Sequence, residues 1–298
     1  MTGTLCDLVA TLPVLVGTLL DREAKLKRGR FREETLTDMF VASLAAFAGP
    51  ELVIQYPHEA STGGDIDLEF WHVETDRRVL LRLQAKRLNA AESRGKFIKV
   101  QNRSYQELLH KVPTTGKYQF EILNNTRDGY VPLYIFYNHG SVAADPYYAN
   151  KCPEVHGINL AFAIDVALAM EDQLGARPKV LYNKRLTRLQ PLFFGLEEIL
   201  CPGGQLTGFV PTPDAVSKAL QNLWNKRVGM SESDEATRLS VHYLLGPLFR
   251  ESSPAPRPRL LDGPAIRTSS EVRRYTITFI SGSPRDEKTP STEEPSQR

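Results

Sequence analysis

Two neighbouring stretches, GGDIDLEFW at residues 63–71 and VLLRLQAKR at residues 79–87, alternate apolar and polar side chains with period two. This alternation predicts two β-strands. The connection between them, residues 72–78, is short and polar, as expected for a hairpin. We therefore predict that the chain folds back on itself here and pairs the two strands.

The polar faces of the two predicted strands carry groups suited to phosphodiester chemistry. One face is acidic and the other is basic with one amide, namely Asp65, Asp67 and Glu69 on the first strand and Arg82, Gln84 and Lys86 on the second. Carboxylates bind divalent cations, and a nearby cation stabilises charge on a phosphate. The hairpin is therefore expected to form a metal site beside a lysine.

Composition predicts a folded core with an uneven charge distribution. The chain has 298 residues, of which 41% are hydrophobic and 24% charged, which suits one large domain or two small ones. The net charge is only +2, but residues 51–76 contain seven acids and no Lys or Arg, whereas residues 77–117 are rich in both. This asymmetry suits a cation site inside a cleft that binds a polyanion, and the alternative is two oppositely charged solvated faces.

Cysteine usage and the N-terminal segment predict a protein of a reducing cytoplasm. The three cysteines, Cys6, Cys152 and Cys201, are far apart and form no CxxC pair, so neither a disulfide framework nor a structural zinc site is expected. The apolar run at residues 8–20 is too short to span a bilayer and lacks a basic segment before it. We expect no signal peptide and no membrane contact, and interpret this run as a packing helix.

Periodicity along the chain predicts a mixed α/β core. We expect a helix over 5–27 bent at Pro13, a helix over 32–48 opened by a capping box of Thr35 and Asp38, and a strand over 52–56 before the hairpin. After the hairpin we expect helices over 101–111 and 119–125 and a strand buried on both faces over 131–137.

The remainder of the chain gives weaker signals. The expected elements are helices over 158–174, 189–200 and 214–227, a Pro-rich linker over 252–264, a strand over 274–280 that adds to a sheet edge, and a disordered tail over 281–298.

The order helix, three strands, helix, strand resembles the core of the PD-(D/E)xK nucleases, the restriction-endonuclease-like fold. The residues that carry the resemblance are Gly64-Asp65 at the start of one strand and Gln84-Ala85-Lys86 at the end of the next. The run Gln84-Ala85-Lys86-Arg87 is similar to the form found in Mrr-type restriction enzymes, in which glutamine replaces the usual acid. Residues 32–38 and 132–138 also resemble a little-characterised bacterial family on the same core.

This resemblance implies a fold and a division of the chain. The fold class is α/β, with a restriction-endonuclease-like αβββαβ core, a mixed central sheet and added helices. Residues 1–30 would be a helix packed on the core, 31–200 the nuclease-like domain, 201–250 a helical extension, and 251–298 the linker, short strand and tail.

The resemblance also implies a metal site for Mg²⁺ or Mn²⁺. Asp65 would be the first ligand, with Asp67 as a second ligand or as the alternative to Asp65. Gln84 would offer its side-chain carbonyl, and Lys86 would orient the attacking water or neutralise the scissile phosphate. Glu34, near the start of the second helix, would reach the metal. Glu33 is the alternative, because helix phase does not separate the two.

Basic residues in and after the hairpin are candidates for phosphate contacts. They are Arg82, Arg87, Lys96, Lys99 and Arg103. The alternative for each is an ordinary solvated side chain.

The expected function is a metal-dependent endonuclease that acts on DNA, in restriction or anti-phage defence by resemblance alone. Two alternatives stay open: a catalytically inactive nucleic-acid-binding or regulatory module, and an RNA nuclease. Expected partners are DNA, or RNA under that alternative, and a second copy of the chain in a homodimer. No Walker loop is present in the sequence, which argues against a nucleotide-driven motor within this chain.

Overall fold

The computed structural model describes residues 4–23, 31–46, 51–57, 65–90, 92–93, 96–124, 129–174, 184–204, 210–229, 266–269 and 274–282. Within these residues, eight strands form one mixed sheet in the order β8-β7-β6-β3-β2-β10-β1-β9. The strands are β1 (Leu52–Pro57), β2 (Asp65–His72), β3 (Arg77–Arg87), β6 (Val131–Tyr137), β7 (Ile158–Phe162), β8 (Phe194–Gly195), β9 (Ile266–Ser269) and β10 (Tyr275–Ser281). A separate hairpin pairs β4 (Glu92–Ser93) with β5 (Lys96–Phe97). The predicted α/β class with a mixed sheet is confirmed.

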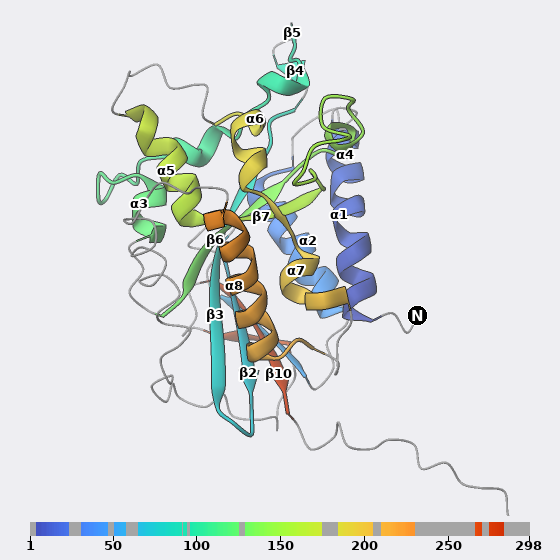
Figure 1. Cartoon of the computed structure of the whole chain (residues 1–298), viewed down its shortest axis with the longest axis vertical. Helices are drawn as coiled ribbons and strands as arrows, with labels where there is room; N and C mark the ends of the chain where they lie inside the picture. Colours follow the sequence, from blue (N-terminus) through green and yellow to red (C-terminus); the bar gives the residue numbers. More distant parts are fainter. Residues whose placement is uncertain are drawn as a thin grey trace, which may run out of the picture.

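The hairpin forms as the alternation predicts. β2 and β3 pair antiparallel, in a register that runs from Asp65 opposite Gln84 to His72 opposite Arg77. β3 then pairs parallel with β6, which places Gln84 beside Tyr134. Every residue of β6 is buried, as the continuous apolar run predicts. The long β2–β3 hairpin crosses the lower half of the molecule in Figure 1.

The C-terminal strand β10 lies inside the sheet, so the prediction that it adds to an edge is wrong. It pairs parallel with β2 on one side and antiparallel with β1 on the other. Its apolar side chains Ile277 and Phe279 are fully buried, and Phe279 stacks on Phe70 of β2 with 4.8 Å between the ring centroids. On the opposite face the Thr278 hydroxyl donates to Glu69 at 3.1 Å. The sheet therefore includes residues far beyond position 200.

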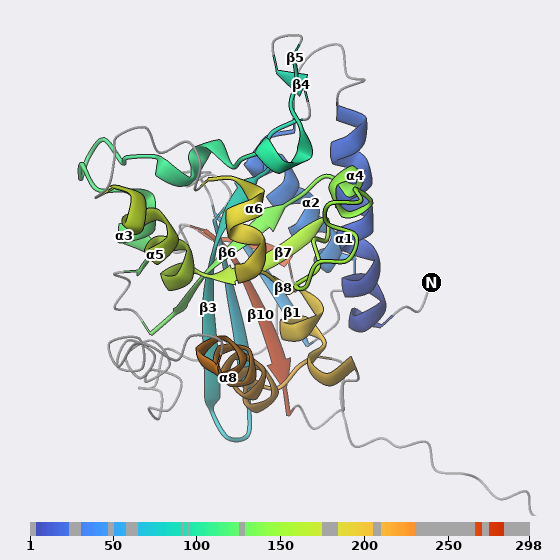
Figure 2. The same ribbon diagram turned by 45° about the horizontal axis from the view of Figure 1, so that its top comes forward.

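Helices cover both faces of the sheet (Figures 1 and 2). The α-helices are α1 (Leu5–Arg22), α2 (Glu33–Ala45), α3 (Gln119–Asn124), α4 (Gly140–Ala143), α5 (Ala163–Leu174), α6 (Leu186–Leu189), α7 (Glu197–Leu200) and α8 (Pro213–Gly229). The 3₁₀ turns are η2 (Val100–Asn102), η3 (Gln106–Leu109), η4 (Gln190–Leu192) and η5 (Pro202–Gly204).

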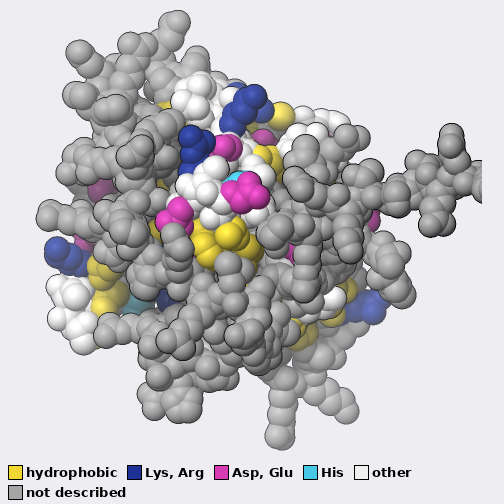
Figure 3. All heavy atoms as spheres, turned by 90° about the horizontal axis from the view of Figure 1, so that it is seen from below, with side chains coloured by type: hydrophobic (Ala, Val, Ile, Leu, Met, Phe, Trp, Pro, Cys, Tyr) yellow, Lys and Arg dark blue, Asp and Glu magenta, His cyan; other side chains and the backbone are white. Residues whose placement is uncertain are grey.

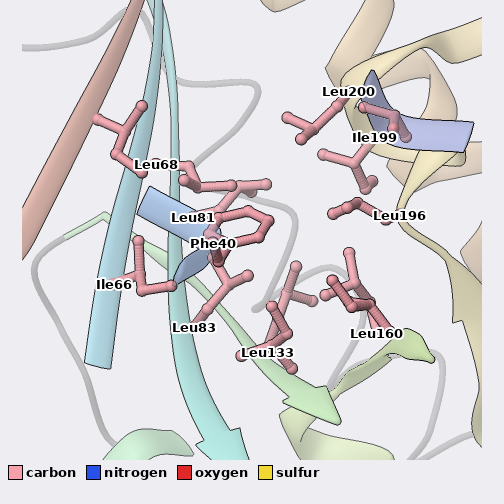
Figure 4. Packing of buried hydrophobic residues seen from close by; sticks show 14 of the residues in the cluster. Phe40, Ile66, Leu68, Leu81, Leu83, Leu133, Leu160, Leu196, Ile199 and Leu200 are labelled. Atoms are coloured by element: carbon pink, nitrogen blue, oxygen red, sulfur yellow. The ribbon is translucent and has the colours of Figure 1, made fainter. Parts of the chain in front are cut away.

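The pleat of the strands sorts the core into two layers. Leu133 and Ile135 of β6 join a cluster with α1, α2, α7 and α8, whereas Tyr134 and Phe136 join a second cluster with η3, α3, α5 and α6. Figure 4 shows the first cluster, in which Phe40 of α2 lies against the leucines of the β2–β3 hairpin.

Three predicted helices differ from the structure. Residues 101–111 form short 3₁₀ turns, whose inward Tyr105 and Leu108 imitate helical spacing. The segment 158–174 divides into strand β7 and helix α5, because residues 158–162 pair with β6. Residues 189–200 divide into η4, the edge strand β8 and the single turn α7.

The ends of the first two helices are also defined. α1 begins at a capping box of Thr4 and Asp7 and continues through Pro13. The predicted capping box of Thr35 and Asp38 is wrong, because α2 begins after Arg32 without a side-chain cap. Among the described segments, no helix combines the length and the apolarity needed to cross a bilayer. The expected linker over 252–264 and the tail beyond residue 282 lie outside the described residues.

The sequence predicts no disulfide framework, and this prediction is wrong for one pair of cysteines. Cys6, in the first turn of α1, and Cys201, at the end of α7, form a disulfide with 5.3 Å between their Cα atoms. The two residues are 195 positions apart, and no local motif marks them as partners. The third cysteine, Cys152, is exposed and free.

Candidate metal site at the carboxyl end of strand β3

Strand β3 delivers an amide and a lysine to one face of the sheet. Gln84 and Lys86 alternate with Leu83 and Ala85, which point into the first core cluster. The register places Asp65, the first residue of β2, directly opposite Gln84. The structure thus brings together the backbones of the two positions that the sequence analysis pairs. For Asp65 the structure describes only the backbone.

The Gln84 side chain is buried with an unsatisfied oxygen. Gln84 is 5% exposed, and its Oε1 atom has no hydrogen-bond partner among the residues that the structure describes. A buried acceptor without a donor costs about 1–3 kcal/mol, so such groups usually mark an ion, a water or a ligand. A cation bound between Gln84 and the neighbouring strand β2 would satisfy this oxygen.

Lys86 is buried and ion-paired with the start of α2. Its Nζ lies 3.3 Å from Glu33 Oε2, and the two side chains are 3% and 19% exposed. The other oxygen of Glu33 accepts the backbone N–H of Arg87 at 3.1 Å. Burial raises the pKa of the Glu33 carboxyl, the Lys86 charge and the Arg87 hydrogen bond oppose this rise, and the Glu107 charge adds to it.

The two glutamates at the start of α2 differ in position. Glu33 reaches the end of β3, whereas Glu34 is exposed on the surface of α2. Successive residues on an α-helix point about 100° apart, so only one of the two can face the sheet. The position of Glu33 therefore suits the role predicted for Glu34 better than that of Glu34 itself.

Asp67 is already bound by an arginine. Arg82 lies opposite it in the register and donates from Nε to Oδ1 at 2.9 Å and from Nη2 to Oδ2 at 3.0 Å. Both side chains are buried, and the guanidinium of Arg82 stacks over the Tyr130 ring at 4.0 Å. Because Arg82 donates to both oxygens of Asp67, Asp65 is the better candidate for a metal ligand of the two predicted aspartates.

The next acid on that face, Glu69, belongs to the same polar layer. It accepts hydrogen bonds from Tyr130 at 3.2 Å and Thr278 at 3.1 Å. Burial raises the pKa of the Glu69 carboxyl, and these two hydrogen bonds partly oppose the rise. The hydrogen bond between Thr278 and Glu69 joins β10 to β2, the strand that begins at Asp65.

Three of the five residues predicted to contact phosphate instead bind groups within the protein. Arg82 pairs with Asp67, and Arg87 forms a close ion pair with the buried Glu23 at the end of α1. The pKa of Arg103 is lowered to about 10 by burial, and its Nε donates to the Asn89 carbonyl at 2.8 Å. These three arginines are engaged within the fold.

Two of the predicted basic residues remain as surface candidates. Lys99 is exposed, and the side chain of Lys96 in β5 lies outside the description. Figure 3 views the opposite end of the hairpin and shows acidic and basic side chains interspersed there. Arg77 pairs with Asp214 at 2.8 Å and Arg78 with Asp76 at 3.5 Å at that end.

The site has a carboxylate that the sequence analysis did not single out. Glu107 projects from η3, whose Leu108 packs in the second core cluster with Phe136, the residue beside Lys86 in the register. Its charge makes the smallest of the contributions to the raised pKa of the Glu33 carboxyl, and 61% of the Glu107 side chain is exposed. Residues 106–109 form a 3₁₀ turn where the sequence predicts an α-helix, and this turn determines the position of Glu107.

The described side chains alone do not complete a metal shell. No group of three or more His, Cys, Asp and Glu side chains within the described residues is arranged to hold a metal ion. Mg²⁺ needs only one or two carboxylates, with carbonyl oxygens and waters in the remaining positions. Glu33 and the unsatisfied Gln84 oxygen, together with Asp65, have the donor chemistry that such a shell requires.

Comparison with known proteins gives a family but no activity. No curated protein and no solved structure matches the chain. A family of unknown function, DUF6615, matches residues 5–286, which include α1, the whole central hairpin and β10. The chain therefore belongs to the DUF6615 family.

Proposed function

We propose that this protein is a metal-dependent phosphodiesterase that cleaves DNA endonucleolytically, with Mg²⁺ or Mn²⁺ as cofactor. The observation that supports this most strongly is the buried Oε1 of Gln84, which has no hydrogen-bond partner within the described part of the chain. Gln84 lies opposite Asp65 in the register and two residues before a buried lysine. A neutral amide oxygen beside an acid suits a divalent cation. A lysine at the same place suits an anionic substrate.

Each side chain has a role in the proposed reaction. Asp65 and Gln84 would hold the metal from adjacent strands, and Glu33 would bind it from α2. The metal would lower the pKa of a bound water and polarise the phosphate. Lys86, released from Glu33 when that carboxylate turns to the metal, would orient the water or neutralise charge on the phosphate.

A second candidate function is a nucleic-acid-binding or regulatory module without catalysis. Two observations favour it: glutamine stands where an acid is usual, and the lysine is held in an ion pair with Glu33 at 3.3 Å. This module would bind DNA in a salt-dependent manner and turn over no substrate in any divalent metal.

Cleavage assays separate these functions. The full chain is incubated with supercoiled plasmid and, in parallel, with single-stranded DNA and RNA, in Mg²⁺, Mn²⁺ or chelator. Metal-dependent cutting that Asp65→Ala, Gln84→Ala and Lys86→Ala abolish supports the nuclease, and the substrate series decides between DNA and RNA. Lys117→Ala, at an exposed turn position, is the matched control.

Two results would reject the nuclease proposal. One is cleavage that survives both Asp65→Ala and Lys86→Ala, which would place the activity elsewhere. The other is an inactive wild type whose Gln84→Glu variant gains metal-dependent cutting, which would support the binding module.

The biological setting is part of the same proposal. A cytoplasmic nuclease of this kind would act on foreign DNA in restriction or anti-phage defence, and a homodimer would allow both strands of a duplex to be cut. Phage plating on cells that express the wild type or Lys86→Ala tests the role. Sedimentation of the purified chain tests the dimer.

A further inference from the structure

The disulfide between Cys6 and Cys201 closes a loop that contains the proposed site. The two cysteines are 195 positions apart, and the enclosed segment includes α2, β2, β3 and β6. It ties the first turn of α1 to the end of α7, two elements whose apolar side chains meet in the first core cluster. A cross-link over so long a loop restricts the unfolded chain strongly.

The other end of α1 contacts the residues next to the site. Glu23, which follows the last residue of α1, forms a close ion pair with Arg87, the residue after Lys86. The same carboxylate accepts the backbone N–H of Phe31 at 3.1 Å, just before α2 and its Glu33. Asp21 accepts both the backbone N–H and the hydroxyl of Ser141 at 2.6 Å. α1 therefore lies between the disulfide and the polar cluster at the end of β3.

The three cysteines differ in access. Cys201 is 5% exposed and Cys6 is half-buried, whereas Cys152 is exposed and forms no disulfide. A small thiol reagent therefore reaches Cys6 before Cys201, and Cys152 is an internal control on the surface.

We propose that Cys6 and Cys201 form a reversible redox site that controls how firmly α1 is held on the core. In the oxidising direction the Cys6 thiolate attacks a low-molecular-weight disulfide such as oxidised glutathione, and one glutathione leaves as a thiolate. The Cys201 thiolate then attacks the Cys6 sulfur and releases the second glutathione. Two protein thiols are oxidised, one glutathione disulfide is reduced, and the two thiol protons end on the released glutathiones.

A redox titration of the full chain tests this proposal. The Cys152→Ser variant, which lacks the surface thiol, is equilibrated in buffers of varied reduced-to-oxidised glutathione ratio, and its free thiols are counted by alkylation and intact-mass spectrometry. We expect two free thiols under reducing conditions and none under oxidising conditions. The Tm of the reduced form should be lower by roughly 10 °C, the size expected for a cross-link of this loop length.

Control variants assign the effect to the cross-link. Cys6→Ser and Cys201→Ser, each alone, should match the reduced Tm and form no intramolecular disulfide, and Cys201→Ser should stop at a mixed glutathione adduct on Cys6. Hydrogen exchange of the α1 amides should be faster in the reduced wild type than in the oxidised wild type. If either variant does not fold, the comparison of reduced and oxidised wild type decides the question by itself.

Three outcomes would overturn the proposal. One is two free thiols at every glutathione ratio. The second is a single Tm in both redox states, and the third is a mixed glutathione adduct on Cys6 that is never displaced by Cys201. Loss or survival of DNA cleavage has no bearing on these readouts, so the two proposals fail separately.

Discussion

Glu33 accepts a hydrogen bond from Lys86 and another from the backbone of Arg87, and so attaches the start of α2 to the end of β3. One carboxylate thereby neutralises the buried lysine and closes one side of the candidate metal site. In the structure this carboxylate forms an ion pair with Lys86, and in the proposed function it is a metal ligand.

Replacing the two helix glutamates separately should distinguish their roles in metal binding. Glu33→Gln should weaken Mn²⁺ binding by at least about tenfold, because it removes a charged oxygen at the end of β3. Glu34→Gln is the matched control and should leave the affinity unchanged, because Glu34 is exposed. Isothermal titration calorimetry measures both. Equal effects of the two substitutions would contradict the assignment of Glu33.

The Lys86–Glu33 pair should show strong energetic coupling. Lys86→Met leaves a carboxylate that is mostly buried without its cation, so we expect a loss of about 2–3 kcal/mol in the free energy of unfolding. Glu33→Gln combined with Lys86→Met should cost less than the sum of the single changes, because neither charge is then left alone. Urea unfolding at pH 7 measures the cycle. Additive effects would show that the two side chains do not interact in solution.

Arg82 and Lys99 should behave in opposite ways. Arg82→Met leaves Asp67 buried and unpaired, and should destabilise the fold by about 3 kcal/mol or more. Lys99→Ala should leave stability within about 0.5 kcal/mol, since Lys99 is exposed. If Lys99 contacts phosphate, its substitution should lower the slope of log binding constant against log salt by about one unit. Fluorescence anisotropy with labelled DNA measures that slope.

Acid should destabilise the protein partly through His139. Burial, with Arg103 and Arg87 nearby, lowers the pKa of His139 from 6.5 to about 3. The Asp21 carboxylate, 3.3 Å from Nδ1, already accepts the hydrogen bonds of Ser141 and does not outweigh the burial. The unfolded chain therefore binds one more proton than the folded chain between pH 6.5 and 3. The stability that His139 contributes is complete above pH 6.5 and falls by up to about 1.4 kcal/mol per pH unit below it.

Unfolding measured at several pH values checks this prediction. His139→Gln should lower stability at pH 7 but flatten its decline between pH 6 and pH 4 relative to the wild type. His110→Gln is the control, because half of the His110 side chain is exposed. An unchanged slope in His139→Gln would show that other groups cause the acid sensitivity.

The sequence predicts the local part of the fold and of the site. Alternation along β2 and β3 defines their faces and puts Gln84 next to Asp65, because the pairing is between neighbours in the chain. The apolar run of β6 and the helices expected over 32–48 and 214–227 are local signals of the same kind. These elements need no knowledge of what packs against them.

Contacts between distant residues set the remainder. The position of β10 between β1 and β2 depends on pairing over more than two hundred residues, and its own sequence suits an edge or a central strand equally. The bonds of Arg82, Arg87 and Arg103 depend on which acid or carbonyl each meets in the folded chain. Whether Glu33 or Glu34 faces β3 depends on where α2 begins. A sequence does not define the end of a helix to within one or two residues.

The central place of β10 also constrains how the protein can be made. Ribosomes deliver the chain from its N-terminus, so β1 and β2 emerge long before residues 275–281 exist. Until then the two strands lack the neighbour that separates them, and each has an open hydrogen-bonding edge. The sheet around the proposed site is therefore incomplete until residue 281 has emerged, and a product terminated before residue 275 would have exposed strand edges prone to aggregation.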